Sequence, residues 1–200
     1  MFLNIFAVPI LRDDFKLSYK DNLDLINQFK LEERTVAMPT NKYPLGSYTS
    51  FYTNSSILDK PVLSELKKYI FETANNLHQS IGLGGTLEFT SSWFSINRQY
   101  GYHESHNHCP DIWSGVYYVK AEYGDATINF INKNLLDTGW PYNAHKNAIN
   151  EFNSTEKICI PTTGMFLIFP SYLSHKVEQQ TIDSDRISIA FNLNVKNDNS

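Results

Sequence analysis

The sequence predicts a mainly β protein with helices near its N-terminus, folded as one domain over residues 1–200. Apolar residues recur at helical spacing in two segments of the first part, whereas after residue 86 they alternate with polar residues in short segments. Aromatic residues make up 14% of the chain and favour sheet, as β-branched residues do. A chain of 200 residues can bury one core, and nothing in it requires a second domain.

Two amphipathic helices are predicted in the first part. Residues 20–33 place apolar side chains at helical spacing, and residues 58–81 repeat the pattern more strongly. Pro61 suits a first helical turn, and the glycine-rich segment at 82–85 predicts the end of the second helix. We therefore expect residues 1–85 to form a helical support for the rest of the domain.

Strand-like segments follow the glycines, and turn residues rather than helices separate them. Short strands in this order indicate an antiparallel sandwich or barrel over residues 86–195. A long polar segment at 133–156 interrupts them, and its Trp140 and His145 are candidates to line a substrate entrance. The expected strands span 86–98, 113–121, 126–132, 157–161, 164–170, 174–179 and 186–195.

Charge and the first residues limit the partners and the compartment. The formal charge of -4 at pH 7 gives no broad basic surface, so neither nucleic acid nor an anionic membrane is a favoured partner. Residues 1–15 are apolar but lack a basic leader, and Pro9 and the charges after it come too early for a signal peptide or a membrane span. Cys109 and Cys159 are too few for a disulfide framework. We therefore expect a cytoplasmic protein with reduced thiols.

Half of the six histidines lie within six positions, at His103, His106 and His108. In extended conformation the side chains of His106 and His108 project from the same face, which is the spacing that two metal ligands need. His103 has the other strand parity, so it joins them only if the strand contains a bulge. The alternative is a group of solvated loop histidines.

The C-terminal segment adds a third histidine and a basic residue. His175 opens a strand, a turn follows, and Arg186 begins the next strand with Ser188 on the same face. We expect a hairpin that brings His175 and Arg186 into one pocket. There the Arg186 guanidinium would clamp a carboxylate with two hydrogen bonds, and Ser188 would be a supporting donor. A surface histidine and an arginine at a hairpin corner is the alternative.

Four motifs carry a family resemblance. They are W-x-x-x-N at 93–97, H-x-H followed by S-G-V-Y-Y-V, P-x-x-G-x-x-x-x-F-P-S-x-x-x-H at 161–175, and R-I-S-I-A-F-N at 186–192. In order and spacing this set resembles the 2-oxoglutarate/Fe(II)-dependent oxygenases of bacteria and marine bacteriophages. The resemblance covers residues 86–195 well and the N-terminal part less well. If the chain is encoded by a phage, its expected compartment is the host cytoplasm.

The resemblance implies a double-stranded β-helix, a jelly-roll of the cupin kind, with Fe(II) at its open end. His106, His108 and His175 would be the metal ligands and so the catalytic residues. His108 stands where that superfamily usually has Asp or Glu. A neutral imidazole there leaves the full divalent charge of the iron, whereas a carboxylate would neutralise part of it.

The resemblance also implies a cosubstrate site and an oxidation. Arg186 and Ser188 would hold the distal carboxylate of 2-oxoglutarate, and Asn97 and Tyr100 are further candidates for contact with it. Dioxygen and 2-oxoglutarate would be consumed, succinate and carbon dioxide released, and a C–H bond of a small-molecule or peptide substrate oxidised.

Two alternatives remain open at this point. A three-histidine dioxygenase of the cupin type would use the same metal cluster without 2-oxoglutarate, and Arg186 would then hold a substrate carboxylate. A non-catalytic jelly-roll module with a vestigial metal site would carry out no oxidation. Release of succinate distinguishes the first alternative from the oxygenase, and failure to bind iron supports the second.

Overall fold

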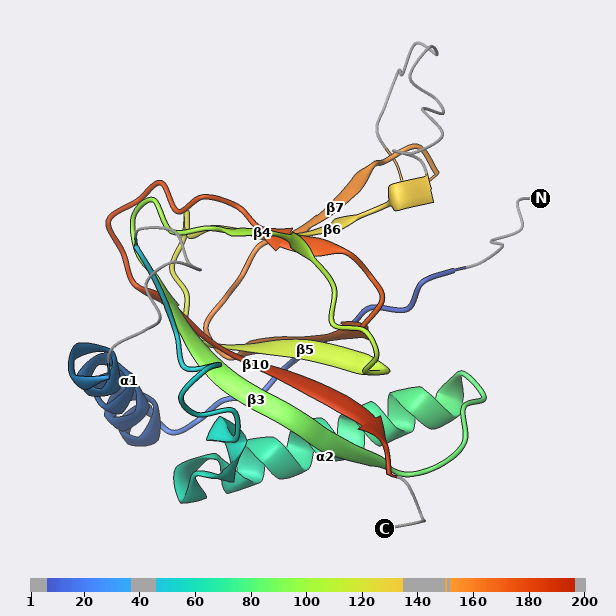
Figure 1. Cartoon of the computed structure of the whole chain (residues 1–200), viewed down its shortest axis with the longest axis horizontal. Coiled ribbons are helices and arrows are strands. Elements are labelled where there is room, and N and C mark those ends of the chain that lie inside the picture. The colour runs from blue at the N-terminus through green and yellow to red at the C-terminus, as the bar shows by residue number, and fades with distance from the viewer. Residues whose placement is uncertain (1–6, 37–45, 135–149, 151, 197–200) are drawn as a thin grey trace.

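Two antiparallel sheets face each other, and helices cover the outer face of the larger one (Figure 1). The computed structural model describes residues 7–36, 46–134, 150 and 152–196. The larger sheet has the order β1-β8-β5-β10-β3-β2, and the smaller has the order β4-β9-β6-β7. The strands are β1 (Leu11–Asp14), β2 (Ser47–Thr49), β3 (Leu87–Asn97), β4 (His103–His106), β5 (Trp113–Lys120), β6 (Ile128–Ile131), β7 (Glu156–Cys159), β8 (Met165–Pro170), β9 (His175–Val177) and β10 (Arg186–Val195).

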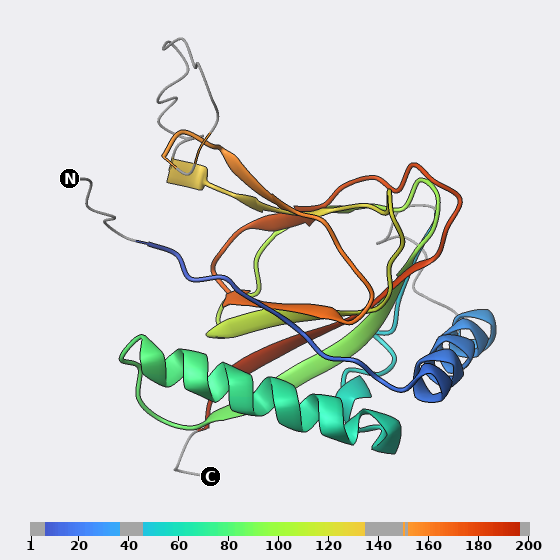
Figure 2. The same cartoon turned by 180° about the vertical axis from the view of Figure 1, so that it is seen from behind.

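Both predicted helices are present. Helix α1 spans Tyr19–Thr35, and the Ser18 side chain caps it by accepting the backbone N–H of Asp21. Helix α2 spans Ser64–Ser80 and follows two short 3₁₀ turns, the second of which begins at Pro61. Figure 2 shows α2 lying across the outer face of the larger sheet.

The core has two parts, one on each face of the larger sheet. On the helix-covered face, Phe29 of α1 stacks on Phe94 of β3 with ring centroids 4.1 Å apart, and both are fully buried. Burial of one such side chain contributes about 1.5–3 kcal/mol. The opposite face packs against the smaller sheet through Val116, Tyr118 and Phe169 among others. The smaller apolar cluster therefore lies between the two sheets.

All seven predicted strands are present within one or two residues of their expected bounds. The structure adds β1, β2 and β4, which the hydrophobic pattern does not indicate. Two of these belong to the part expected to be helical: β1 pairs with β8, and β2 pairs with β3. Each added strand has four residues or fewer, too short for alternation to be visible.

The predicted hairpin between His175 and Arg186 is wrong. Strand β9 pairs with β4 and β6 in the smaller sheet, whereas β10 pairs with β3 and β5 in the larger sheet. The connection crosses between the sheets, and its buried Gln180 accepts the N–H of Ala126 and donates to Asp125. These contacts fix the crossing, so the two strands meet across the gap between the sheets and not side by side.

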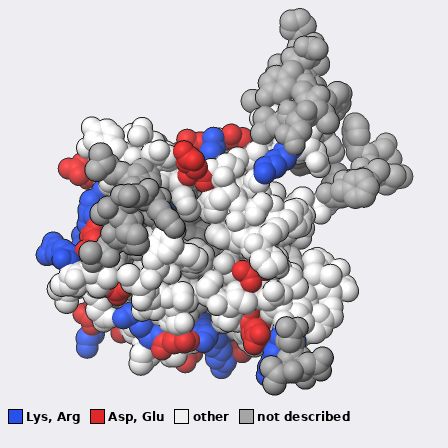
Figure 3. Space-filling view, in the orientation of Figure 1, with Lys and Arg blue, Asp and Glu red and all other residues white. Residues whose placement is uncertain are grey.

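The face shown in Figure 3 carries charged side chains of both signs. On the face shown in Figure 3, Lys and Arg side chains are interspersed with Asp and Glu, and no broad basic area is visible among the described residues. Within the part of the chain that the structure describes, no helix is both long and apolar enough to cross a membrane. Cys109 and Cys159 are free thiols.

Candidate metal and cosubstrate site

Three histidines converge between the sheets. His106 ends β4, His108 lies in the loop after it, and His175 begins β9 directly opposite His106. One ring nitrogen from each residue lies within 4.8 Å of the other two. The pairing of β4 with β9 therefore brings the H-x-H motif and the distal histidine together, as the motif spacing predicts.

Two of the three rings are oriented by the backbone. Nδ1–H of His106 donates to the carbonyl of Glu104 at 2.7 Å, and Nδ1–H of His175 donates to the carbonyl of Leu173 at 2.9 Å. A carbonyl can only accept, so these bonds place the proton on Nδ1 and leave the lone pair on Nε2. Both rings are thus in the tautomer that a metal ligand needs.

Burial keeps the histidines neutral. It lowers the pKa of His108 to about 4 and that of His175 to about 3, with a further contribution from the neighbouring His106. The pKa of His106 is lowered too, chiefly by burial and against the effect of its bond to Glu104. Neutral imidazoles bind metals, so no proton has to be displaced near pH 7.

A fourth histidine joins the group through a bulge. The pairing of β4 with β9 shifts register between His103 and His106, which overcomes the difference in strand parity. The ring centroids of His103 and His106 are 4.0 Å apart, and burial lowers the pKa of His103 to about 4. His103 lines the same pocket, although its nitrogens are not among the three that converge.

Arg186 lies in the same pocket and is 2% exposed. Its Nη2 donates to the hydroxyl of Tyr118 at 3.3 Å, and its guanidinium carbon lies 4.9 Å from the centre of that ring. Its Nε is buried and has no hydrogen-bond partner among the described residues. A buried cation with an unused donor fits a negatively charged ligand, and 2-oxoglutarate carries two carboxylates.

The other predicted cosubstrate residues differ in placement. Ser188 is buried and lines the pocket one strand period after Arg186, and Asn97 lines it from β3 while donating to Ser47 Oγ at 3.2 Å. The structure does not bring Tyr100 into the pocket, because its side chain is 61% exposed and its φ is 72° in a turn. Tyr102, two residues later, lines the pocket instead.

The pocket is small and mostly walled by strands. Its volume is about 80 Å³, and its walls include Trp93, whose ring centroid lies 5.8 Å from that of His108. Phe51 packs edge-on against Trp93 at 4.9 Å and is 40% exposed, so aromatic rings lead from the surface to the histidines. Trp140 and His145, expected near a substrate entrance, lie outside the described residues.

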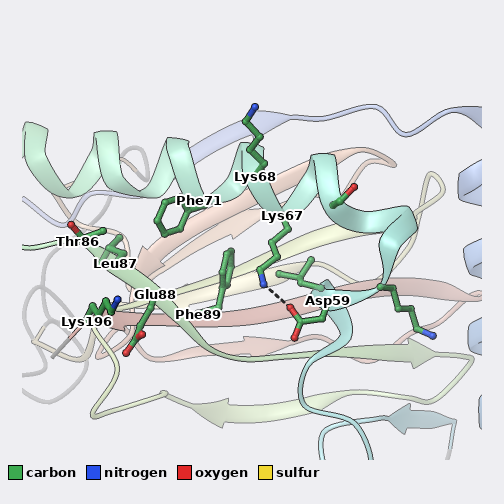
Figure 4. Close-up of a pocket in the computed structure, with 12 residues that line it drawn as sticks. Asp59, Lys67, Lys68, Phe71, Thr86, Leu87, Glu88, Phe89 and Lys196 are labelled. Carbon is green, nitrogen blue, oxygen red and sulfur yellow. Dashed lines mark hydrogen bonds and ion pairs between the residues drawn. The ribbon is translucent and has the colours of Figure 1, made fainter. Parts of the chain in front are cut away.

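A second hollow, of about 710 Å³, lies between α2 and β3. Figure 4 shows Lys67 reaching Asp59 there, beside Phe89 and Phe71. No histidine lines it, and it opens on the side of the sheet that the helices cover. The histidine pocket is therefore the candidate site, although it is the smaller of the two.

Comparison with known proteins agrees with this geometry. A family model described as "Putative 2OG-Fe(II) oxygenase" matches residues 91–192, just over half of the chain. The chain belongs to this family. The oxygenase thus uses Fe(II), 2-oxoglutarate and dioxygen to oxidise a substrate. Family membership supports this activity over the three-histidine cupin and the non-catalytic module. No sequence among curated proteins matches the oxygenase.

Solved structures show the same fold. A prolyl-4-hydroxylase from Pseudomonas putida superposes with a TM-score of 0.64 at 12% identity, covering 94% of this chain and 93% of that one. A viral collagen prolyl hydroxylase from Paramecium Bursaria Chlorella virus-1, in complex with 2-oxoglutarate, gives 0.60 at 14% identity, with 94% and 96% covered. HygX from Streptomyces hygroscopicus, with nickel and 2-oxoglutarate bound, gives 0.60 at 10% identity, with 94% and 83% covered. The predicted double-stranded β-helix is confirmed.

Sequence reasoning missed Tyr102 and Ser47, which line the pocket, and Tyr118, which does not line it but contacts Arg186. Tyr118 is part of the S-G-V-Y-Y-V motif, and strand alternation from Val116 could have placed it on the inner face. Tyr102 lies in a turn-rich segment where parity cannot be followed. Ser47 reaches the pocket from β2, whose three residues carry no strand pattern of their own.

Proposed function

We propose that His106, His108 and His175 hold the Fe(II) of this oxygenase. Three neutral imidazole nitrogens within 4.8 Å of one another support the assignment. Ligands about 2.1 Å from one ion lie about 3 Å apart when they are at right angles, so a small rotation of the rings completes the set. Three imidazoles fit iron, and they leave coordination positions open for other ligands.

We further propose that Arg186 and Ser188 hold the distal carboxylate of 2-oxoglutarate. The observation that carries this assignment is the buried Nε of Arg186, which has no partner among the described residues, on a side chain that lines the pocket of the histidines. Ser188 supplies a hydroxyl on the same face of β10. Asn97 contributes to the wall next to Arg186, because these two residues are directly paired across β3 and β10.

The protein's part in the oxidation is binding, orientation and exclusion of water. Iron together with 2-oxoglutarate and dioxygen supplies the oxidising chemistry, with release of succinate and carbon dioxide. Arg186 would orient the cosubstrate from β10, and the histidines would hold the iron that binds its other end. Apolar side chains of Val116, Ile128 and Phe169 line the space between and limit access of water.

We propose that the substrate is a small molecule or a peptide that presents one group at the pocket mouth. A pocket of about 80 Å³ is small even for the cosubstrate, so in this proposal most of the substrate stays outside. The whole chain acts as one domain in this proposal, because β1 and β2 of the first part complete the larger sheet.

Anaerobic titration of the Fe(II) protein with 2-oxoglutarate tests the proposal. Chelation of iron by the cosubstrate gives a metal-to-ligand charge-transfer band, which requires both the iron site and the 2-oxoglutarate site. We expect one equivalent of iron and one of 2-oxoglutarate per chain. Absence of the band from iron-loaded protein would contradict the assignment. Succinate release during a screen of metabolites and peptides would then identify the substrate.

A further inference from the structure

Three buried polar side chains and a half-buried one, Ser91, form a hydrogen-bonded chain beside the loop that carries His108. Ser171 follows β8, and Ser114, Asn192 and Ser91 lie in the adjacent strands β5, β10 and β3. The Ser114 hydroxyl donates to Asn192 Oδ1 at 2.8 Å, so Ser171 is the donor in its 2.7 Å contact with Ser114. Asn192 Nδ2 donates to Ser91 Oγ at 3.2 Å. The chain therefore runs in one direction across three strands.

Stability alone does not account for this chain. Ser171 is 0% exposed and Ser114 is 1% exposed, and Ser114 lies on the face of β5 that carries Val116 of the smaller apolar cluster. A buried hydroxyl without a partner is costly, and a satisfied one adds little compared with a well-packed apolar side chain. What such a network does provide is one defined geometry, because each member has a fixed partner.

Ser171 transmits that geometry to the metal site through its backbone. Its carbonyl accepts the N–H of His108 at 2.9 Å, and its own N–H donates to the carbonyl of Ile112 at 2.9 Å. The loop between is closed by the N–H of Asp111, which donates to the carbonyl of His108 at 3.1 Å. Ser171 thus holds both ends of the loop, and its position sets that of His108.

His108 depends on this anchor more than the other two histidines do. The rings of His106 and His175 are each fixed by a bond from Nδ1 to a carbonyl. No hydrogen bond to the ring of His108 is present among the described residues. Its orientation rests on contacts with neighbouring rings and on where the backbone places it.

We propose that the hydrogen-bonded chain of Ser171, Ser114, Asn192 and Ser91 positions His108 for metal binding. These are positioning residues, because none of them lines the histidine pocket. The inference rests on the proposed role of His108 as a ligand, and it explains why polar residues stand in the S-G-V, F-P-S and A-F-N segments of the motifs.

Anaerobic titration with Co(II) alone measures the effect, since the visible absorption of Co(II) reports coordination geometry and affinity together. Ser171→Ala detaches the loop anchor from the chain. We expect Co(II) to bind about tenfold more weakly, as is typical when an outer partner of a ligand is lost, with a changed spectrum. Ser91→Ala removes only the far end, so a smaller change in the same direction is expected. Ser91→Ala alone decides the question if Ser171→Ala does not fold.

Ser92→Ala is the matched control. Ser92 is buried in the same strand as Ser91, but its hydroxyl accepts the N–H of Leu58 at 3.0 Å on the helix-covered side. This variant should lower the melting temperature and leave Co(II) affinity and spectrum unchanged. Parent-like Co(II) binding in both Ser171→Ala and Ser91→Ala would overturn the proposal.

His108→Ala distinguishes the positioning role of the hydrogen-bonded chain from the assignment of His108 as a ligand, on which that role rests. If His108→Ala binds Co(II) as tightly as the parent, the assignment of His108 as a ligand fails. If His108→Ala weakens binding while the serine variants do not, the ligand assignment stands and only the positioning role fails.

Discussion

The guanidinium of Arg186 lies 4.9 Å from the ring of Tyr118 and donates one long hydrogen bond to its hydroxyl, at 3.3 Å, while its Nε has no partner among the described residues. An unsatisfied buried donor costs about 1–3 kcal/mol, and more when it is charged. The ring holds the arginine in place without using up its donors. This arrangement supports the proposed binding of a carboxylate by Arg186.

Replacement of Arg186 should weaken binding of 2-oxoglutarate and leave iron in place. Arg186→Lys keeps the charge but loses the planar pair of donors. Arg186→Ala should cost more, about 2–5 kcal/mol, because the carboxylate is then buried without a cationic partner. The measurement is anaerobic titration of the Fe(II) form through the charge-transfer band.

Arg98→Lys serves as the control for this series. Arg98 directly follows the end of β3 and forms ion pairs with Glu33 and Asp185, and none of these three residues lines the pocket. The Arg98→Lys variant should bind 2-oxoglutarate with the affinity of the parent protein. Tight cosubstrate binding by Arg186→Ala would favour a carboxylate site elsewhere.

Replacement of His175 should abolish iron binding. His175→Ala leaves two imidazoles, and the loss should exceed the roughly 10- to 100-fold that removal of an outer partner causes. Metal content after anaerobic reconstitution and desalting gives the answer. His78→Gln is the control, because His78 is 1% exposed but lies on α2, bonds to Trp113 and Gly84, and does not line the pocket. Equal metal content in the two variants would refute the assignment.

Substitution of His108 tests whether the oxygenase requires an imidazole at this position or only tolerates one in place of the usual carboxylate. His108→Asp should retain iron, because a carboxylate is the usual ligand at this position in the superfamily that the motifs resemble, and it balances the charge of the metal. Raised turnover of 2-oxoglutarate in this variant indicates that the histidine is only tolerated there, whereas lowered turnover indicates that three imidazoles are required. Full iron binding by His108→Ala would show that the residue is not a ligand.

The stability of the metal-free protein should fall in mild acid. Burial lowers the pKa of His108 to about 4 and that of His175 to about 3, against about 6.5 in an unfolded chain. Between pH 6.5 and those values the unfolded chain binds more protons, so the free energy of unfolding falls as the pH falls through this window and levels off above it. Urea midpoints at pH 7.5, 6 and 5, with a chelator present, measure the slope. His175→Gln should show a shallower slope, and an unchanged slope would mean that His175 does not contribute.

Alternation determined how much of the sheet was predictable. In strand β10, polar residues such as Ser188 face the smaller sheet and alternate with apolar residues such as Ile189, which face the helices. The bounds of this strand were predicted to the residue. Strand β4 has the sequence HESH, which contains no apolar residue to show a period. Its existence depends on pairing with β9, which only the fold supplies.

The meeting of the histidines could be predicted from the spacing of the motifs. The route by which the chain brings Arg186 to them could not, because it depends on a crossing between the sheets. His106 and His175 meet because their strands pair directly, as expected for two residues predicted to bind one metal ion. Arg186 reaches the same pocket from the other sheet, because the segment that holds Gln180 crosses the gap. Tyr100 and Tyr102 could not be ranked from sequence, because the left-handed φ of Tyr100 redirects the chain between them.

Because the chain crosses between the sheets after β9, a ligand bound as proposed would connect the two sheets. The histidines on β4 and β9 belong to the smaller sheet and Arg186 belongs to the larger one, so a molecule held at both ends joins two layers that the backbone connects only by loops. Amide protons of β9 should therefore exchange more slowly with solvent when iron and 2-oxoglutarate are bound together than when iron is bound alone. The cosubstrate would then act as a removable crosslink between the two layers of the fold.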